Sequence, residues 1–225
     1  MTADARPTTS PLDTAMDAGV SPTVQSIFER ILATIHDGGL RPGTTVRDTE
    51  IARELGMSRT PVREAFQMLR EAGVLEVSAS RFTRIAVISP DQTEQAARAW
   101  LALFSIVLDG VVAAGPHSGA TIAELETDHA EAVAGTIAFD NPRVAAANAR
   151  LFSTAVLLSD NPYLVKAVAS VAHVLRLGML SLPSSIDLSL LLRAQRETID
   201  AIRDGDRESA ARAIASLSAI TIPRV

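Results

Sequence analysis

A glycine turn between two short amphipathic segments most constrains the fold of this chain. Residues 48–55 and 58–72 each repeat apolar side chains at the three- and four-residue spacing of a helix, and Gly56 interrupts the pattern between them. Asp48 can cap the first segment, because its carboxylate can accept from free N–H groups of a first turn. The pattern predicts two short helices joined by a tight turn. Their inward side chains are Ile51, Ala52 and Leu55, followed by Val62, Ala65, Phe66 and Leu69.

The flanking segments predict a winged helix-turn-helix. An earlier segment, residues 22–35, has a single apolar stripe and is expected to form a helix. After the two short helices come alternating segments at 74–77 and 82–87, joined by polar residues, which predict a β-hairpin. Three helices followed by a hairpin are the elements of a winged helix-turn-helix, expected here over residues 22–88.

The rest of the chain predicts an all-helical domain over residues 89–225. Its long apolar-periodic segments are separated by short breaks, and no segment has a credible strand pattern. Residues 1–21 lack a basic start and a continuous apolar core, so we expect a disordered tail and no signal peptide. The expected fold is mainly α, a winged helix-turn-helix followed by a helical bundle. The expected bundle helices lie at about 91–114, 119–136, 142–159, 162–180, 187–204 and 206–220.

Composition excludes several classes of protein. The 225 residues are 47% hydrophobic, which is enough for a sizeable core. The absence of cysteine rules out disulfides, thiolate metal sites and a cysteine nucleophile. The most membrane-like run, at 96–115, is interrupted by Arg98 and Asp109, so we expect no membrane span. These features are typical of a cytoplasmic protein.

Two arginines stand one turn apart at the start of the second short helix. Arg59 and Arg63 fall opposite its apolar face, at the end that enters the major groove in a helix-turn-helix. A guanidinium can bond guanine or clamp a phosphate, and the hydroxyls of Ser58 and Thr60 can cap the helix or contact phosphates. The alternative is that both arginines are solubilising charges. The net charge of −5 does not exclude DNA, because residues 22–88 carry nine basic and eight acidic side chains.

The same region resembles a family of bacterial transcription regulators. LRPG at 40–43, IARELG at 51–56 and above all SRTPVREA at 58–65 are similar to the winged-helix domain of the GntR family. The resemblance implies that Arg59 and Arg63 contact operator DNA, with Thr60 near the DNA backbone. The helical remainder resembles, more distantly, the effector-binding and dimerisation (FCD) domain of the FadR-type subgroup.

The chain departs from the family pattern at the wing. There the family usually holds a glycine that lets the backbone approach the minor groove, but Ser80 and Phe82 occupy the candidate positions here. Arg81 and Arg84 are left as the wing side chains that can reach phosphates.

A second departure lies at the start of the middle helix. Some relatives carry a further DNA-contacting arginine there, whereas this chain has Thr49, and Arg47 is the expected substitute. The predicted DNA-binding residues are Arg47, Thr49, Ser58, Arg59, Thr60, Arg63, Arg81 and Arg84.

The metal site common in this subgroup has lost its ligands. Many members bind a divalent metal through an aspartate and three histidines, a set that suits zinc or nickel. SDNP at 159–162 and AIRDGD at 201–206 resemble the subgroup's motifs and align the chain with it. The four ligand positions then carry two amides, a phenylalanine and a leucine, so we expect no metal and no other cofactor. These positions are Asn148, Phe152, Gln195 and Leu217.

The four positions allow two interpretations. Two amides among apolar groups are typical of a small-molecule pocket with a few hydrogen-bonding groups. The alternative is that side chains fill the cavity, so that these positions form part of the hydrophobic core. Trp100, His173 and Arg176 lie on apolar helices and can point inward, where a buried arginine requires an anionic partner from the protein or from a ligand. The candidate pocket comprises Trp100, Asn148, Phe152, His173, Arg176, Gln195 and Leu217.

The resemblance implies a homodimeric transcription regulator, usually a repressor, that binds double-stranded operator DNA. An apolar or acidic small-molecule effector in the helical domain would control it. One alternative is a helical domain that only dimerises. Another is an enzyme, but the chain has no G-x-S-x-G, H-E-x-x-H, G-x-G-x-x-G or P-loop motif, so we expect no enzymatic activity.

Overall fold

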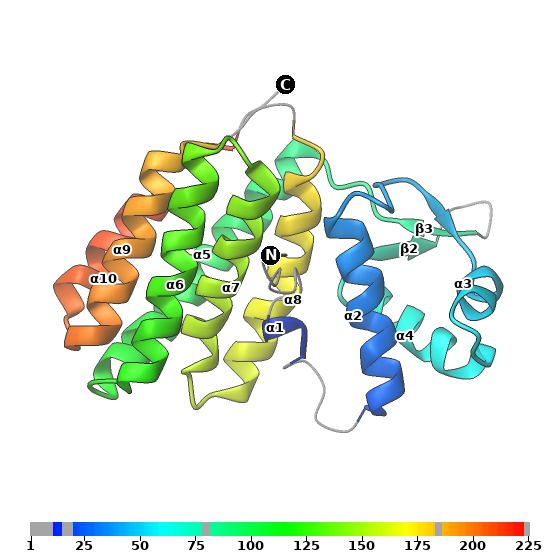
Figure 1. The fold of residues 1–225 in the computed structure, drawn as a ribbon, viewed down its shortest axis with the longest axis horizontal. Coiled ribbons are helices and arrows are strands. Elements are labelled where there is room, and N and C mark those ends of the chain that lie inside the picture. Colours follow the sequence, from blue (N-terminus) through cyan, green and yellow to red (C-terminus); the bar gives the residue numbers. More distant parts are fainter. Residues whose placement is uncertain (1–10, 15–19, 78–81, 183–185, 223–225) are drawn as a thin grey trace, which may run out of the picture.

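The computed structural model describes residues 11–14, 20–77, 82–182 and 186–222, arranged as two units side by side (Figure 1). A small unit of helices and short strands lies at one end, and a bundle of long helices forms the rest. This is the mainly α fold that the sequence predicts. The small unit comprises α2 (Pro22–His36), β1 (Thr45–Val46), α3 (Asp48–Glu54), α4 (Arg59–Glu71), β2 (Leu75–Val77) and β3 (Thr83–Ile85).

The bundle helices follow one another up and down with short connections (Figure 1). Helix α5 packs against α8 and α10, while α6 packs against α7 and α9. Their apolar stripes meet in one core that includes Phe104, Leu125 and Ile199, all fully buried. The helices are α5 (Pro90–Ala113), α6 (Gly119–Ile137), α7 (Asn141–Leu157), α8 (Pro162–Met179), α9 (Leu188–Asp204) and α10 (Arg207–Ser218).

Each bundle helix begins at a side chain that accepts hydrogen bonds from its free N–H groups. Ser89 forms a capping box with Gln92 at the start of α5, and Asn161 accepts from two backbone amides at the start of α8. Helix α9 ends at Gly205, whose φ of 65° is the left-handed conformation that glycine adopts without strain. These local signals place the helix ends within two residues of the expected ranges. The other caps are Ser118, Asp140, Asp187 and Asp206.

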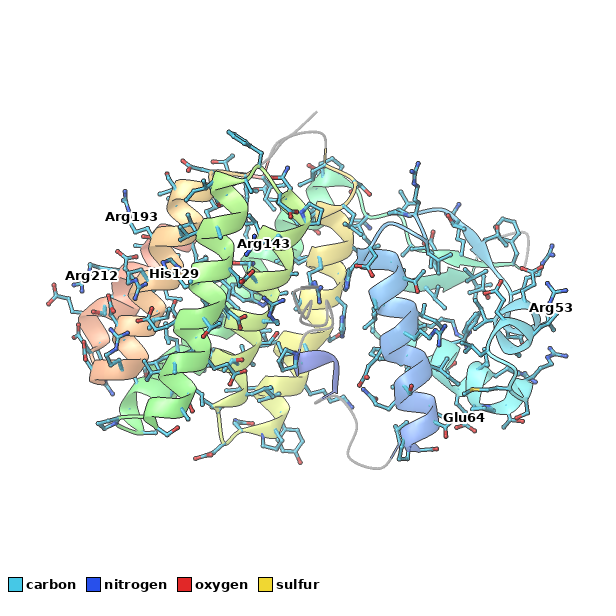
Figure 2. All side chains as sticks on the ribbon, viewed as in Figure 1. Arg53, Glu64, His129, Arg143, Arg193 and Arg212 are labelled. Carbon is cyan, nitrogen blue, oxygen red and sulfur yellow. The ribbon has the colours of Figure 1, made fainter. Side chains whose placement is uncertain are left out.

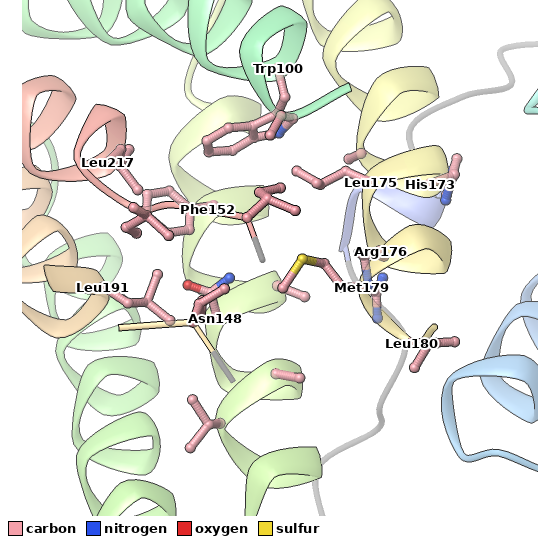
Figure 3. A pocket seen from close by; sticks show the side chains of 18 of the residues that line it. Trp100, Asn148, Phe152, His173, Leu175, Arg176, Met179, Leu180, Leu191 and Leu217 are labelled. Carbon is pink, nitrogen blue, oxygen red and sulfur yellow. The ribbon is translucent and has the colours of Figure 1, made fainter. Parts of the chain in front are cut away.

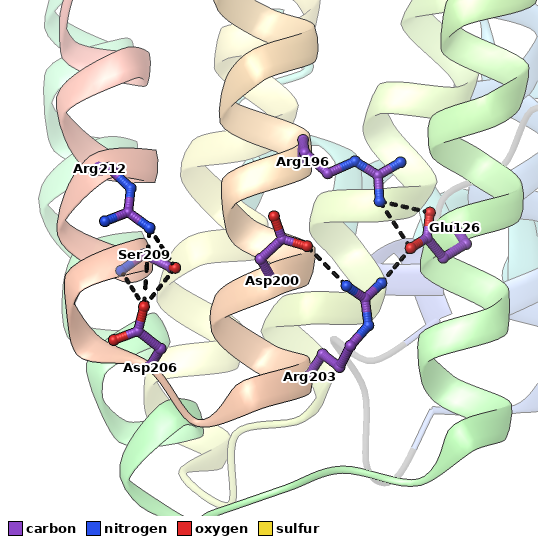
Figure 4. A network of polar contacts seen from close by, with 7 residues as sticks. All are labelled: Glu126, Arg196, Asp200, Arg203, Asp206, Ser209 and Arg212. Carbon is purple, nitrogen blue, oxygen red and sulfur yellow. Dashed lines mark hydrogen bonds and ion pairs between the residues drawn. The ribbon is translucent and has the colours of Figure 1, made fainter.

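An ion-pair network ties α6 to α9 (Figure 4). Both carboxylate oxygens of Glu126 accept from Arg196 Nη1 at 2.8 Å, and Glu126 also pairs with Arg203, which in turn binds Asp200 at 2.8 Å. The hydrogen bond from Arg196, and then the charges of both arginines, lower the pKa of Glu126. The network links the two helices at the outer side of the bundle.

The winged unit has its own core, built as the sequence predicts. Val62, Ala65, Phe66 and Leu69 of α4 are all buried against α2, which leaves the opposite side of α4 in solvent. The hairpin forms between β2 and β3, and β1 adds a third strand that the sequence analysis missed. With two residues, β1 is too short to produce an alternating pattern, and only its pairing with β3 identifies it.

Helix α8 belongs to the bundle but also contacts the winged unit. Leu177, 1% exposed, lies in the winged core, and the His173 ring packs edge-on against Phe28 of α2 with centroids 5.8 Å apart. A Cβ on Gly73 would come within 3.0 Å of Val174, so the turn after α4 lies directly against α8. The contact side of α8 therefore carries His173, Val174 and Leu177.

Two local predictions are wrong. Residues 11–14 of the expected disordered tail form α1 (Pro11–Thr14), and Leu12 is buried against the bundle because it fills an apolar gap beside α7. Asp48 does not cap α3 from the position before the helix. It is the first residue of α3, Arg47 stands at the cap position, and the Asp48 carboxylate turns to Arg59 instead.

Helix α5 is the one described helix long and apolar enough, by length and composition alone, to cross a membrane. It lies in the bundle, where one side, including Phe104, Val107 and Val111, is buried. The opposite side is apolar yet exposed, and Ile106 there is 57% exposed. A helix of this length and composition also occurs in the core of helical bundles. The bundle itself does not account for the exposed apolar side of α5.

Candidate functional sites

The first candidate site is the solvent-facing start of α4. Arg59 and Arg63 stand one turn apart, with side chains 60% and 73% exposed, because the residues between and after them anchor the helix from its other side. The two guanidinium groups thus project together from the edge of the winged unit. This is the arrangement that the sequence predicts for a helix that enters a DNA groove.

Asp48 of α3 lies between these two arginines. Its Oδ2 accepts from Arg59 Nη2 at 3.0 Å and is 4.0 Å from Arg63 Nε. The hydrogen bond from Arg59 is the main reason that the pKa of Asp48 is lowered. One carboxylate is thus hydrogen-bonded to Arg59 and within ion-pair distance of Arg63, whereas the sequence analysis expected it to cap α3.

The first turn of α4 is itself open to an anion. Ser58 stands at the cap position without a side-chain cap bond, and no acidic residue lies in this first turn. Ser58 and Thr60 are both exposed. Free N–H groups, two hydroxyls and the positive end of the helix dipole thus surround the arginines, which is a favourable setting for a phosphate.

Residues of α3 extend this face. Arg47 and Thr49 are exposed, and Arg47 pairs with Glu50 at 2.9 Å, so the expected substitute arginine lies beside the recognition helix but is held by a neighbour. Arg53, which the sequence analysis did not single out, also projects into solvent from α3, and Glu64 does so from α4 (Figure 2). In the sequence, the only indication that Arg53 belongs to this face was its position on the polar side of a very short helix.

The wing contributes less than expected among the described residues. Arg84 of β3 donates to Glu76, its direct cross-strand partner in β2, at 2.6 Å. That pair stabilises the hairpin and occupies the guanidinium. Phe82 is 38% exposed at the edge of the wing. Ser80 and Arg81 lie outside the described residues.

The second candidate site is a pocket of about 1000 Å³ in the helical unit (Figure 3). Its walls come from α1, α5, α7, α8, α9, the end of α10 and the chain after it, and the end of α2 closes one side. The volume lies at the upper end of ordinary ligand pockets. Of the seven predicted pocket residues the structure brings six to its wall, namely Trp100, Asn148, Phe152, His173, Arg176 and Leu217. Gln195 is fully buried behind Asn148 instead.

Aromatic rings form one end of the pocket. Trp100 stacks on Phe104 with centroids 4.8 Å apart, and Phe152 meets both rings edge-on at 5.3 and 5.2 Å. Leu217 of α10 lies beside them (Figure 3). Edge-on and stacked pairs hold these rings in fixed orientations, so this end offers a rigid apolar surface.

The two amides at former ligand positions bind each other. Gln195 Nε2 donates to Asn148 Oδ1 at 3.0 Å, and Gln195 Oε1 lies 3.0 Å from His129 Nδ1. These contacts join His129, Gln195 and Asn148 in one hydrogen-bonded chain, in which the sequence analysis gave His129 no role. Nowhere in the described parts of the chain do three or more histidines or acidic residues cluster as they would around a metal ion. These residues do not fit the metal of the subgroup.

The other end of the pocket is nitrogen-rich. Arg176 and His173 of α8 and His36 of α2 all line it. Burial, followed by the charge of Arg176, lowers the pKa of His36 to about 2 and that of His173 to about 3. Both imidazoles are therefore neutral next to a permanent positive charge.

Comparison with protein families matches both units. Residues 23–85 match the model described as bacterial regulatory proteins of the gntR family, and residues 110–218 match the FCD domain. The first match contains α4 and its arginines, and the second contains most of the pocket wall.

Individual relatives agree. The chain is 29% identical over 201 residues to a probable D-xylose utilization operon transcriptional repressor of Paenarthrobacter nicotinovorans, covering 86% of this chain and 84% of the relative. It is 32% identical over 154 residues to an HTH-type transcriptional regulator of Agrobacterium vitis in the TAR-I ttuE-ttuC′ intergenic region, covering 67% of this chain and 90% of the relative.

Solved structures share the whole fold. McbR/YncC of E. coli superposes with a TM-score of 0.70 at 19% identity, over 88% of this chain and 94% of the other. A putative GntR regulator from Rhodococcus sp. RHA1 gives 0.67 at 19% identity, over 88% and 91%. The chain belongs to the GntR family of HTH-type DNA-binding transcription regulators, which are not enzymes, and carries a C-terminal FCD domain.

Proposed function

We propose that this protein is a homodimeric repressor that releases its operator when a small organic effector enters the FCD pocket. The observation that carries the DNA-binding part is the exposed pair Arg59 and Arg63 at the uncapped start of α4. One relative is a probable transcriptional repressor, which supports repression rather than activation. Regulators of this kind act on chromosomal DNA, which supports a cytoplasmic location.

The two arginines should carry specific operator binding. We expect Arg59→Ala or Arg63→Ala to weaken binding to the DNA upstream of the protein's own gene by about 5- to 150-fold, equivalent to about 1–3 kcal/mol. Fluorescence anisotropy with a labelled duplex at fixed salt measures this. Arg193→Ala, which removes an exposed arginine from α9, is the matched control and should bind as wild type does. Wild-type affinity in both test variants would refute the proposed DNA-binding face.

The pocket favours the hypothesis that a ligand controls the protein. It counts against the alternative, a helical domain that only dimerises. A space of about 1000 Å³ lined by ordered rings at one end and polar groups at the other is costly to leave inside a domain whose sole task is association. This proposal includes no metal-dependent step. The hydrogen bond between Asn148 and Gln195, two positions where the resemblance implies metal ligands, supports that choice.

The outer stripe of α5 supports a homodimer. Small or apolar exposed residues repeat along it at intervals of three and four, and a Cβ on Gly110 would meet nothing within 4 Å, so a second helix can approach closely. A two-fold axis beside α5 would cover this stripe with its own copy and would set two copies of α4 against two half-sites. The stripe consists of Ala99, Ala102, Ile106, Gly110 and Ala113.

A further inference from the structure

Among the described residues, Asp48 is the acidic side chain that contacts both arginines at the start of α4. Its Oδ2 accepts a hydrogen bond from Arg59 Nη2 at 3.0 Å and lies 4.0 Å from Arg63 Nε. The Asp48 side chain is 25% exposed, whereas the two arginine side chains are 60% and 73% exposed. The carboxylate therefore contacts the guanidinium groups from the protein side, and their outer sides remain open to a ligand.

This contact leaves most of each guanidinium able to bind DNA. A guanidinium has several N–H donors, and Asp48 occupies one nitrogen of Arg59. Arg63 has its Nε toward the carboxylate, so the two terminal nitrogens, which form the fork that bonds O6 and N7 of a guanine, are unoccupied among the described residues. Each arginine can thus keep its contact with Asp48 and bond a base edge at the same time.

The carboxylate affects phosphates and bases differently. The hydrogen bond from Arg59 lowers the pKa of Asp48, so the carboxylate is ionised at neutral pH. A phosphate that binds either arginine brings a second negative charge close to this carboxylate, and like charges in contact cost free energy. A guanine edge offers neutral acceptors, so its electrostatic penalty is smaller. Asp48 also cancels one of the two positive charges of the arginines, which weakens the sequence-independent attraction to DNA.

We propose that Asp48 determines specificity on the DNA face: its carboxylate penalises contacts of Arg59 and Arg63 with phosphates more than contacts with base edges, and so restricts both arginines to reading bases. Phosphate contacts are then left to the uncapped first turn of α4 at Ser58. This inference rests on the proposed role of the two arginines and adds what makes them selective. Asp48 acts through the arginines, so it is a positioning residue.

Asp48→Asn tests the proposal, because it removes the charge and keeps the size and one acceptor oxygen of the side chain. Fluorescence anisotropy measures the affinity of the full-length protein for two labelled duplexes over a series of salt concentrations. One is the DNA upstream of the protein's own gene, and the other has the same length and base composition in scrambled order. We expect the variant to bind the scrambled duplex more tightly, so that the ratio of the two affinities falls about five-fold or more at fixed salt. We also expect the slope of log K against log salt on the scrambled duplex to steepen by about 0.9, the value for one further neutralised phosphate.

Glu54→Gln is the matched control. It makes the same charge change on α3, at an exposed side chain that has no contact with either arginine in the described parts of the chain. It should leave the affinity ratio and the salt slope as in the wild type. In an Arg59→Ala/Arg63→Ala background, Asp48→Asn should no longer change the ratio, since its effect acts through the arginines. A loss of folded protein lowers the apparent affinity for both duplexes by the same factor, so the ratio does not depend on the stability of the variant.

Two outcomes would overturn the proposal. An unchanged ratio and an unchanged slope in Asp48→Asn would show that the carboxylate does not discriminate. A ratio that falls only because operator affinity drops, with an unchanged slope, would show that Asp48 itself contacts the bases.

Operator binding by Arg59→Ala and Arg63→Ala separates this inference from the proposed function. If both variants bind the operator as the wild type does, the proposed DNA-binding face is wrong. If they bind it weakly and Asp48→Asn leaves the ratio unchanged, only the specificity role of Asp48 is refuted.

Discussion

At the scale of single residues, buried histidines make the domain junction sensitive to pH. His36 and His173 have pKa values lowered to about 2 and about 3 by burial and then by Arg176, whereas an unfolded histidine titrates near 6.5. Below pH 6.5 these two histidines therefore bind protons in the unfolded chain but remain neutral in the folded chain. Stability is full above pH 6.5 and falls as the pH drops below it, because ΔG of unfolding rises with pH wherever the unfolded state binds more protons.

We expect ΔG of unfolding to fall by up to about 1.4 kcal/mol per pH unit for each histidine between pH 6.5 and 5.5. Urea denaturation at pH 7.5, 6.5 and 5.5 measures it. This window lies above the range in which the carboxylates with lowered pKa values titrate, so the slope reports histidines. The double variant His36→Gln/His173→Gln should lose most of the slope, while His117→Gln, in the loop after α5, should keep it. An unchanged slope in the double variant would show that the junction histidines are not the cause.

Sequence could predict the residue types of both sites but not their pairing. The SRTPVREA string was enough to nominate Arg59 and Arg63, and the SDNP and AIRDGD motifs were enough to nominate Asn148 and Gln195 as facing positions in the helical unit. That Asp48 would hold both arginines, or that His129 would complete the amide chain, depends on contacts between elements far apart in sequence. Such contacts leave no periodic signal in a single sequence.

At the scale of elements, α5 has two apolar sides, and among the described residues only one of them packs against other helices. Its inner side packs on α8 and α10, and its outer stripe remains exposed. A second copy of α5 is the partner that best fits a narrow stripe of small residues, because two helices can then pack at close range.

A charge in this stripe should therefore separate the dimer. We expect Ile106→Glu to raise the dimer dissociation constant by more than about 30-fold, equivalent to about 2 kcal/mol, because it buries a carboxylate in an apolar contact. Sedimentation velocity over a concentration series measures the change. Ile137→Glu is the matched control, since Ile137 is 75% exposed at the end of α6 and away from the stripe. If the Ile106→Glu variant dimerises as the wild type does, the dimer interface does not include the outer stripe of α5.

The long elements were predictable and the short ones were not. Six bundle helices follow from apolar periodicity together with side-chain caps such as Ser89 and Asn161, which act locally. Helix α1 and strand β1 are too short to show a period, and each is fixed by a partner distant in sequence, the bundle core for Leu12 and β3 for Val46. Tertiary contacts rather than propensity decide such segments.

At the scale of the whole molecule, α8 links the two sites. It lines the pocket with Arg176, packs His173 on Phe28 of α2, and inserts Leu177 into the core that supports α4. A ligand in the pocket and the DNA face of α4 are thus joined through one helix and one shared core. The central claim is that two chains present two such faces to one DNA duplex.

Native mass spectrometry of the protein mixed with the duplex from upstream of its own gene tests this claim most directly. We expect a complex of two chains on one duplex for the wild type. For the Arg59→Ala/Arg63→Ala variant we expect a dimer of unchanged mass without DNA. A single chain on the duplex, or a double variant that holds the duplex as the wild type does, would contradict the claim.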